Sequence, residues 1–488
     1  MVMITHATKL SVLLLAFTIG MIALLQYRPI TDVDIFWQIK AGELILQRGS
    51  LQIEDSFTIT HAGELIPPVG WLAQVIFAIA FRMGGWPAIH LLNAFCYAAT
   101  FLIAGGTAKN LVRRRRISAS LFSYGFALGL GFLVGLSNTS DRPQSFGVLS
   151  FALVLYIARS DQSLRSKALL TAPILLFWQN CHPSLAVGVL ALGALLAGEV
   201  VRLRRVDLGT VTNYAVLGIL AVLAIFATPM GLQIFEVSEA NMHIARSLGV
   251  SEWQYPWHES VRGAVMPYWL ALALTLAMLA TLRSRIELRD LAFCAIMTLL
   301  SLSAARFALF WAVSMVPLWT VWSERVRPSK LFAYPADQLV RRCWPAVFML
   351  IGLPLVALLP AAVRPSILDR ELPTRAVARL QEFMPQGRIY NYREWAGPLI
   401  LKGHPDWRVT IDGRLYFFPA IDWDDYNAAA QGQIPVRVLH DRFRPDAFFL
   451  QPRFHRALIE LLRRDTGWQE IYADRSAVIF LSKRYSEF

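Results

Sequence analysis

Long apolar runs recur through roughly the first three-quarters of this 488-residue chain. The first of them, residues 10–25, reads LSVLLLAFTIGMIALL. Each run is near the ~20 residues that a helix needs to cross the hydrocarbon core of a bilayer. Hydrophobic residues make up 56% of the chain and its mean hydropathy is +0.45, above an ordinary soluble domain. The sequence therefore predicts a mostly α fold, a polytopic transmembrane helical bundle.

The net charge of +13 lies mainly in short segments between the apolar runs. Residues 363–488, in contrast, carry 19 Lys and Arg against 16 Asp and Glu. Short basic loops of membrane proteins remain on the cytoplasmic side, so this charge indicates topology and we expect no nucleic-acid partner. The basic clusters with this expected location are residues 109–116, 159–167, 202–205, 283–289, and 324–330 with Arg341 and Arg342.

The alternation of these clusters predicts about eleven spans, with the first apolar run retained as an uncleaved span. Residues 71–81 are too short to span and are expected to form a helix in the membrane interface. The remaining spans are predicted as a helix over 86–107, hairpins over 117–158, 168–201 and 290–323, and single helices over 209–228, 267–282 and 345–361.

The chain after the last apolar run has a different pattern. Four short β-rich runs, residues 388–392, 408–412, 447–451 and 477–482, predict strands. Two amphipathic runs, residues 374–384 and 455–464, predict helices. We therefore expect a transmembrane module over 1–362, with a first outer loop at 28–85 and a second at 229–266. A small extracytoplasmic α/β domain is expected over 363–488.

Charge parity sends several unusual polar groups to the side opposite the basic clusters. Ionisable groups at membrane depth are costly, which makes them functional candidates. Asp32 and Asp34 are candidates for a general base, and a solvated acid pair in a loop is the alternative for them. The other candidates, suited to holding a phosphate or a sugar, are Trp37, Glu54 and Asp55 from the first loop, and Arg142, Asn180, His182 and Arg306 from the hairpin tips.

Residues 32–77, which begin DVDIFWQIKAGELILQRGS, resemble the first outer loop of bacterial membrane glycosyltransferases of the GT-C superfamily. The similarity is closest to a branch with no well-defined substrate. It continues in DRPQSFGVLSFAL, NCHPSLAVG and ARFALFWAVSMVP at the three hairpin tips. In the tail, IYNYREWAGPLI and TIDGRLYFF also resemble that branch.

The resemblance implies a polyprenyl-phosphate-linked sugar as donor, and a lipid-linked glycan, polysaccharide or protein as acceptor. Transfer would be inverting, with or without a divalent metal such as Mg²⁺ or Mn²⁺ at Asp32 and Asp34. It also implies that Asp34 or Asp32 is the catalytic base and that the protein resides in a bacterial inner membrane with a periplasmic tail. Two positions depart from the pattern: Pro183 follows His182, and Gln38 stands where relatives often have histidine.

Two other functions fit a polytopic chain of this kind. One is a transporter or flippase without chemistry, which would carry acids inside its helices and often shows repeated halves. Here the acids lie in loops and no internal repeat is found in the sequence. The other is an envelope-assembly protein that has a GT-C-like fold without activity, because fold does not imply function.

Overall fold

The apolar runs form helices in the computed structural model, which describes residues 6–201, 207–326 and 367–485. Contacts divide the chain into two units. The bundle unit comprises Met1–Arg28, His90–Leu232 and Arg246–Pro365. The loop–tail unit comprises Pro29–Ile89, Gln233–Ala245 and Ser366–Phe488.

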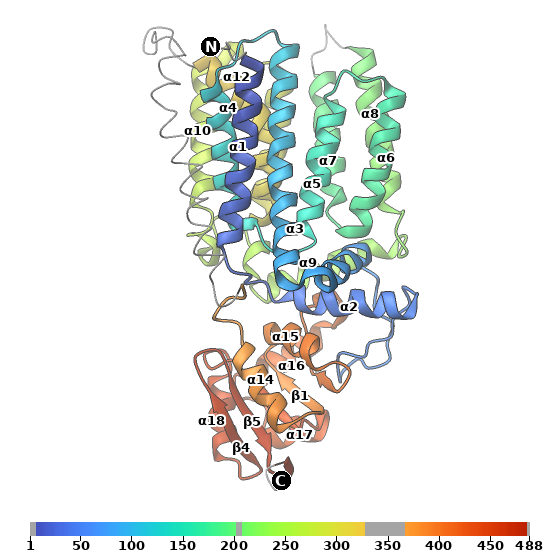
Figure 1. The fold of residues 1–488 in the computed structure, drawn as a ribbon, viewed down its shortest axis with the longest axis vertical. Helices are drawn as coiled ribbons and strands as arrows, with labels where there is room; N and C mark the ends of the chain where they lie inside the picture. Colours follow the sequence, from blue (N-terminus) through green and yellow to red (C-terminus); the bar gives the residue numbers. More distant parts are fainter. Residues whose placement is uncertain (1–5, 202–206, 327–366, 486–488) are drawn as a thin grey trace. The chain divides into compact units, whose positions relative to one another are not determined.

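The bundle unit consists of helices that run side by side (Figure 1). Five helices of the described residues are long and apolar enough to cross a membrane, and three more are apolar but shorter. The predicted last span, residues 345–361, lies outside the described residues. The helices of the unit are α1 (His6–Tyr27), the later part of α3 (Trp71–Arg114), α4 (Leu121–Gly135), α5 (Gln144–Ala158), α6 (Leu164–Cys181), α7 (Leu185–Val200), α8 (Leu208–Ile225), α10 (Met266–Leu282), α11 (Leu288–Ser303) and α12 (Ala308–Val326).

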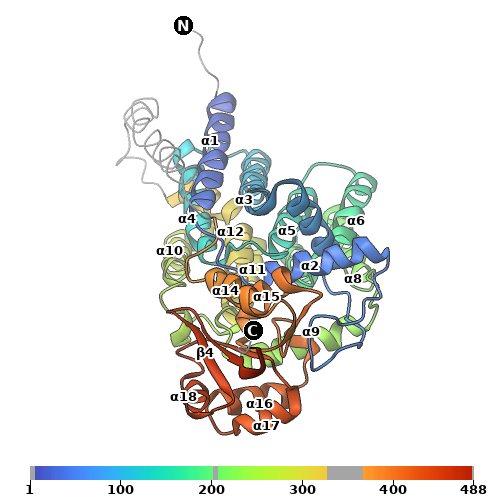
Figure 2. The same ribbon diagram turned by 60° about the horizontal axis from the view of Figure 1, so that its bottom comes forward.

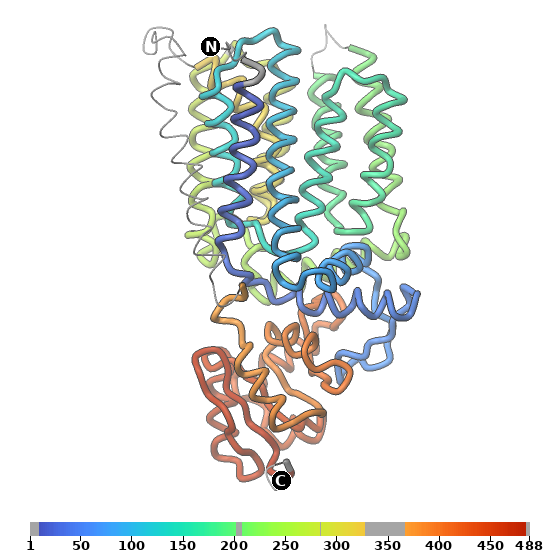
Figure 3. Tube along the Cα trace, viewed as in Figure 1, coloured from blue at the N-terminus to red at the C-terminus, as the bar shows by residue number. Residues whose placement is uncertain are grey.

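The three predicted hairpins are present, as the tube in Figure 3 lets the reader follow. α4 and α5 join through a short 3₁₀ turn (Leu136–Asn138), and α6 turns directly into α7 at His182. α11 and α12 join through a 3₁₀ turn (Ala305–Phe307). The sequence located these turns correctly because each combines polar residues with proline or small residues between two apolar runs.

The basic clusters meet at one end of the bundle unit. Arg115, almost fully buried, forms two hydrogen bonds of 2.6 and 2.7 Å with Asp290, and Arg289 lies 2.9 Å from Glu199. These pairs join segments that are distant in sequence. This agrees with the prediction that the basic clusters all lie on the same side of the membrane. The hairpin tips meet at the opposite end.

Helices α4 and α12 pack closely because two glycines on α4 face α12. A Cβ on Gly131 would lie 2.8 Å from Val316, and one on Gly135 would lie 2.6 Å from Leu309. Small residues four apart allow two membrane helices to approach at backbone distance. On its other sides, α12 buries Trp311, Trp319 and Trp322 completely.

Helix α3 contains the break that separates the predicted interfacial helix from the predicted span. Gly84 and Gly85 have non-helical backbone angles, and Gly85 has φ of 60° and ψ of −148°. Only glycine adopts the latter conformation without strain, so the pair Gly84–Gly85 ends the first helix. Residues up to Ile89 belong to the loop–tail unit and residues from His90 to the bundle unit.

The tail contains a five-stranded mixed sheet in the order β2-β1-β3-β5-β4. The first three strands are parallel, while β5 is antiparallel to β3 and β4. The strands are β1 (Gly387–Asn391), β2 (Trp407–Val409), β3 (Ala447–Leu450), β4 (Trp468–Ala473) and β5 (Val478–Ser482). The four predicted strands are thus confirmed, and β4 was not predicted.

Three helices of the tail pack directly on the sheet. α14 packs on β4 and β5, α15 packs on β2, and α18 packs on β4 as well as on α16 and α17 (Figure 2). The tail helices are α14 (Thr374–Phe383), α15 (Ala396–Gly403), α16 (Ala420–Ala430), α17 (Val436–Phe443) and α18 (Arg456–Arg464). α14 and α18 correspond to the two predicted amphipathic helices.

The first loop is part of the same unit as the tail. It contains α2 (Asp34–Arg48), which packs on α15, and residue Ile30 forms a bridge with Leu368. A second bridge joins Thr58 to Val409 at the end of β2. The contact-based division therefore differs from the division by composition at residue 362, which assigned the first loop to the transmembrane module. α9 (Gln233–Ser247), from the second loop, contributes its first residues to this unit.

Candidate functional site

The acid pair lies at the start of α2: Asp34 is the first residue of the helix and Asp32 precedes it by two residues. Asp32 is buried, and its Oδ1 accepts a hydrogen bond from the backbone N–H of Asp34 at 2.9 Å. Asp34 is half-buried, and its Oδ1 accepts a hydrogen bond from Trp37 Nε1 at 3.2 Å. Asp32 therefore stabilises the start of the helix, as a side-chain cap does, while Asp34 presents its carboxylate beside an indole ring.

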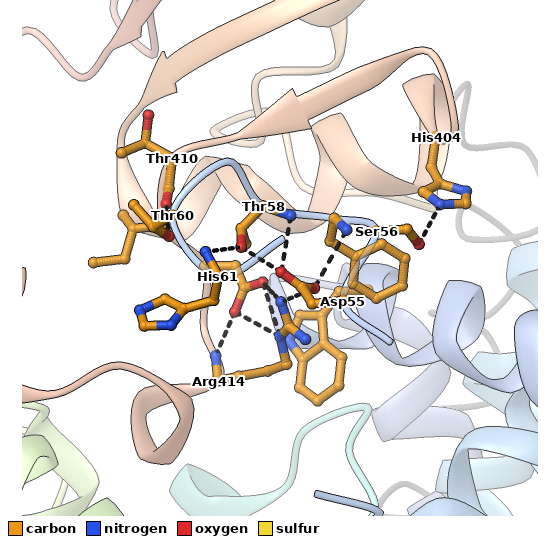
Figure 4. Close-up of polar contacts among 12 residues, drawn as sticks. Asp55, Ser56, Thr58, Thr60, His61, His404, Thr410 and Arg414 are labelled. Carbon is orange, nitrogen blue, oxygen red and sulfur yellow. Dashed lines mark hydrogen bonds and ion pairs between the residues drawn. The ribbon is translucent and has the colours of Figure 1, made fainter. Parts of the chain in front are cut away.

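Asp55 is buried and bonded within the protein, so its role is to stabilise the fold. Its carboxylate accepts hydrogen bonds from the backbone N–H groups of Phe57 and Thr58 and from the Thr58 hydroxyl (Figure 4). Arg414 Nη2 lies 2.8 Å from Asp55 and 2.5 Å from Asp412, and all three side chains are fully buried. The two carboxylates raise the pKa of Arg414 although burial opposes this. The Asp55–Arg414–Asp412 cluster thus joins the first loop to the tail.

Glu54 differs from its neighbour Asp55. Its side chain is exposed, and its backbone forms a bridge with Leu65 across the first loop. The structure thus separates two acids that the sequence treats alike. Of the first-loop candidates, Asp34 and Trp37 lie together, while Asp55 lies in the buried cluster.

In the bundle unit, two predicted arginines meet at one carboxylate. Arg142 Nη1 lies 3.0 Å from Glu252 Oε2, and Arg306 Nη1 lies 3.6 Å from Glu252 Oε1. The Arg306 guanidinium also lies over the Trp253 ring, 4.2 Å from its centroid. We call these four residues the arginine cluster. Its net charge of +1 and its partly exposed side chains suit an anionic ligand.

The charges of the arginine cluster influence one another. Burial alone raises the pKa of Glu252, but the charges of Arg142 and Arg306 more than compensate and hold its pKa below the usual value. Glu252 is therefore ionised at neutral pH and compensates part of the positive charge.

His182 lies beside this cluster and is neutral. Burial, followed by the charge of Arg306, lowers its pKa to about 3. Its Nδ1 is buried and has no hydrogen-bond partner among the residues that the structure describes. A Cβ on Gly147 would lie 3.4 Å from that nitrogen, so α5 approaches the ring closely. A neutral imidazole with an unused nitrogen can exchange a hydrogen bond with a ligand.

The remaining hairpin-tip candidate, Asn180, and the acid next to Arg142, Asp141, bind other parts of the protein. Asn180 donates hydrogen bonds of 2.9 Å to the carbonyl groups of Leu176 and Ala227, which ties α6 to the end of α8. Asp141, which precedes Arg142, lies 3.0 Å from His90 of α3. Both residues therefore hold the tips of the bundle together.

The acids do not form a recognisable metal centre. Within the described ranges, no group of three or more His, Cys, Asp or Glu side chains could hold a metal ion. Asp32 Oδ1 already accepts the Asp34 N–H at 2.9 Å. Protein-bound Mg²⁺ prefers octahedral oxygen ligands, and the pair by itself does not supply such a set.

Sequence reasoning missed two contributors to these arrangements, Glu252 and Gly413. Glu252 lies in the second outer loop, among aromatic residues. The available signal was the two arginines at hairpin tips, which require a counter-charge. Gly413 approaches Asp34 so closely that a Cβ would lie 2.2 Å from Asp34 Oδ1. No sequence signal predicts that proximity, because 379 residues separate the two positions.

Comparison with known proteins identifies the fold of this chain but no related sequence. No protein-family model matches the chain, and no curated protein sequence matches it. The structure is similar to that of apo ArnT from Cupriavidus metallidurans, with a TM-score of 0.59, 14% identity and 98% of each chain covered. ArnT from the same organism bound to undecaprenyl phosphate matches with a TM-score of 0.53 and 12% identity, over 97% of this chain and 98% of that one. The chain thus has the fold of ArnT, and the expected helical bundle with a small α/β tail is confirmed.

Proposed function

We propose that this protein is an integral-membrane glycosyltransferase of a bacterial inner membrane. It would transfer a sugar from a polyprenyl-phosphate-linked donor to a glycan, lipid or protein acceptor on the periplasmic face. The observation that carries the proposal is the convergence of Arg142 and Arg306 on one carboxylate beside the neutral His182. This occurs in a fold shared with a protein whose solved structure holds undecaprenyl phosphate.

In the proposed reaction, the hydroxyl oxygen of the acceptor attacks the anomeric carbon of the donor sugar. The bond between that carbon and the phosphate oxygen breaks, and its electron pair leaves with the lipid phosphate. Asp34 accepts the hydroxyl proton as general base, which such a step requires. Asp34 is half-buried, and its Oδ1 accepts a hydrogen bond from Trp37 Nε1 at 3.2 Å.

The arginines have the complementary role. Arg142 and Arg306 would hold the phosphate and stabilise the charge that develops on it as the bond breaks. The neutral His182 would add a hydrogen bond without adding charge. Asp32 fixes the first turn of α2 and so supports Asp34 without reacting itself. No step requires a metal.

The test uses the full-length protein in lipid nanodiscs, with undecaprenyl-phosphate-linked pentoses and hexoses that carry a radiolabel. Membranes from cells that lack the gene supply the acceptors, and label transfer is measured by chromatography. We expect transfer by the natural protein and a loss of about 100-fold or more with Asp34→Asn, because amide nitrogen and oxygen cannot accept the proton.

The matched control is Asp424→Asn, which changes an exposed carboxylate on α16 of the same unit. This variant should retain natural activity. Both variants should elute as monodisperse protein with unchanged melting temperatures. Equal transfer rates for Asp34→Asn and the natural protein would exclude Asp34 as the base, and no transfer from any donor by the natural protein would contradict the proposed function.

A further inference from the structure

The turn Asp412–Gly413–Arg414 of the tail lies directly against the carboxylate of Asp34. An ideal Cβ on Gly413 would be 2.2 Å from Asp34 Oδ1, 3.4 Å from Asp34 Cγ and 3.4 Å from Trp37 Nε1. A Cβ atom and an oxygen 2.2 Å apart would overlap, so a side chain at position 413 would displace either the turn or the Asp34 carboxylate. The glycine therefore leaves space for the Asp34 carboxylate in its present orientation.

Two sets of contacts hold the tail against the first turn of α2. Arg414, the next residue, is fixed by Asp55 of the first loop and by Asp412 of its own turn, all without exposure to solvent. On α15, Gly397 would place a Cβ 2.1 Å from the carbonyl oxygen of Val33, the residue before Asp34. The tail thus contacts the first turn of α2 at both its backbone and its acid.

The turn also occupies a particular edge of the tail sheet. It follows β2, so it lies at the carboxyl end of the parallel strands β2, β1 and β3. In open α/β sheets this edge, near the point where the strand order reverses, is where ligands and catalytic groups are placed. Here the edge receives the first turn of α2 instead of a separate ligand.

We infer that Gly413 is a positioning residue for Asp34, and that the tail orients this catalytic base by holding its carboxylate against the Asp412–Arg414 turn. This inference depends on the proposed function, because it assigns the positioned group to the transfer reaction. Gly413 itself has no side chain that could react. Because Gly413 has no Cβ, the carboxylate of Asp34 can adopt its orientation beside Trp37.

Gly413→Ala is the direct test. The added methyl group forces the Asp34 carboxylate to rotate away from Trp37 or the turn to withdraw from α2. A displacement of about 1 Å at a reacting group can cost about 100-fold in rate. We therefore expect kcat to fall between about 10- and 100-fold, while KM for the lipid-linked donor changes little, because the altered group acts on the acceptor hydroxyl.

Two other glycines of the tail serve as matched controls. Gly403→Ala introduces a methyl group that is equally crowded, 2.3 Å from the Trp407 ring, and its three nearest atoms all belong to Trp407 instead of Asp34. Gly467→Ala places a methyl group 3.2 Å from another carboxylate, that of Asp465. Both should leave kcat per folded molecule unchanged, even where Gly403→Ala lowers the melting temperature.

A second readout does not require activity. Labelling of carboxyl groups with a water-soluble carbodiimide and glycine ethyl ester, followed by mass spectrometry, reports the accessibility of Asp34. Gly413→Ala should change the labelling rate of Asp34 and leave that of Asp424 unchanged. If Gly413→Ala does not fold, Arg414→Lys replaces it, since lysine keeps the charge but cannot bind two carboxylates as a planar fork does.

The outcomes separate the two proposals. Natural kcat and natural Asp34 labelling in Gly413→Ala would overturn the positioning role, even if the natural protein transfers sugar. Altered labelling with no transfer by the natural protein would support the contact between Gly413 and Asp34 and contradict the glycosyltransferase function. A parallel loss of kcat in Gly403→Ala and Gly413→Ala would show that tail stability alone is responsible, and would also overturn the positioning role.

Discussion

Glu252 is the residue whose environment has the most direct consequence for ligand binding. It forms contacts of 3.0 and 3.6 Å with Arg142 and Arg306, so it occupies the guanidinium groups that a phosphate would use. A carboxylate and a phosphate compete for the same planar donors. Binding of a lipid phosphate would then require Glu252 to give up at least one of these contacts.

Glu252→Gln should therefore bind undecaprenyl phosphate more tightly than the natural protein. The change raises the charge of the arginine cluster from +1 to +2 and removes the carboxylate that both partly buried arginines contact, which lowers the stability of the unliganded protein. The measurement is the rise in melting temperature on addition of undecaprenyl phosphate, which we expect to be larger for the variant. An equal or smaller rise would contradict competition, and Glu259→Gln, from the same loop, is the control.

At the residue scale, the sequence identified single groups better than their partners. Arg142 and Arg306 were recognisable because a charge beside a hairpin turn is unusual in an apolar chain. Their common partner Glu252 was not, because 110 residues separate it from Arg142 and 54 from Arg306. Asp55 was recognisable as an acid, yet its role depends on Arg414, 359 residues away. Spacing along the chain does not encode such long-range pairs.

At the element scale, the hydrophobic pattern predicted the elements that are buried throughout or along one face. The membrane hairpins and the buried strands β3 and β5 are apolar runs, and β1 buries its last three residues. The apolar residues of α14 and α18 recur at helical spacing. β4 was missed because only its first residue, Trp468, is buried and the others face partly outward. An edge strand needs no apolar pattern, because one neighbouring strand is enough to stabilise it.

The buried histidine at the start of α18 predicts how the tail responds to pH. His455 is fully buried, its Nδ1 accepts the backbone N–H of Gln451 at 3.3 Å, and its Nε2 lies 3.3 Å from the Tyr426 hydroxyl. Burial lowers its pKa from 6.5 to about 3. The unfolded chain therefore binds a proton below pH 6.5 that the folded tail does not bind, and this difference favours unfolding.

The stability that neutral His455 provides is complete above pH 6.5 and decreases as the pH falls toward about 3. At pH 5 the loss is about 2 kcal/mol, since 1.5 pH units correspond to that free energy. Hydrogen exchange of residues 447–464, corrected for intrinsic rates at pH 5 and 7.5, measures it. His455→Gln should be less stable at pH 7.5 but show less pH dependence. The same dependence in this variant as in the natural protein would contradict the role of His455.

At the scale of the whole molecule, the sequence predicted the two kinds of structure but not how they are joined. Composition changes near residue 362 and suggests that the tail is separate. Contacts instead group the tail with the first loop, residues 29–89. The reason is the Asp55–Arg414–Asp412 cluster, together with the backbone bridges at Ile30 and Thr58. Local patterns carry no information on a unit assembled from segments as distant in sequence as residues 29–89 and 366–488.

The cluster should therefore control the stability of the loop–tail unit as a whole. Arg414→Met keeps the approximate volume but leaves Asp55 and Asp412 buried without a counter-ion, which costs about 3–5 kcal/mol. We expect limited proteolysis of this variant to cut both the first loop and the tail, while the bundle helices stay intact. Replacing all three residues, as Asp55→Asn with Asp412→Asn and Arg414→Met, removes the buried charges and should recover part of the loss. Cleavage of the tail alone, with the first loop still protected, would show that the two segments are stable independently and that the cluster does not join them.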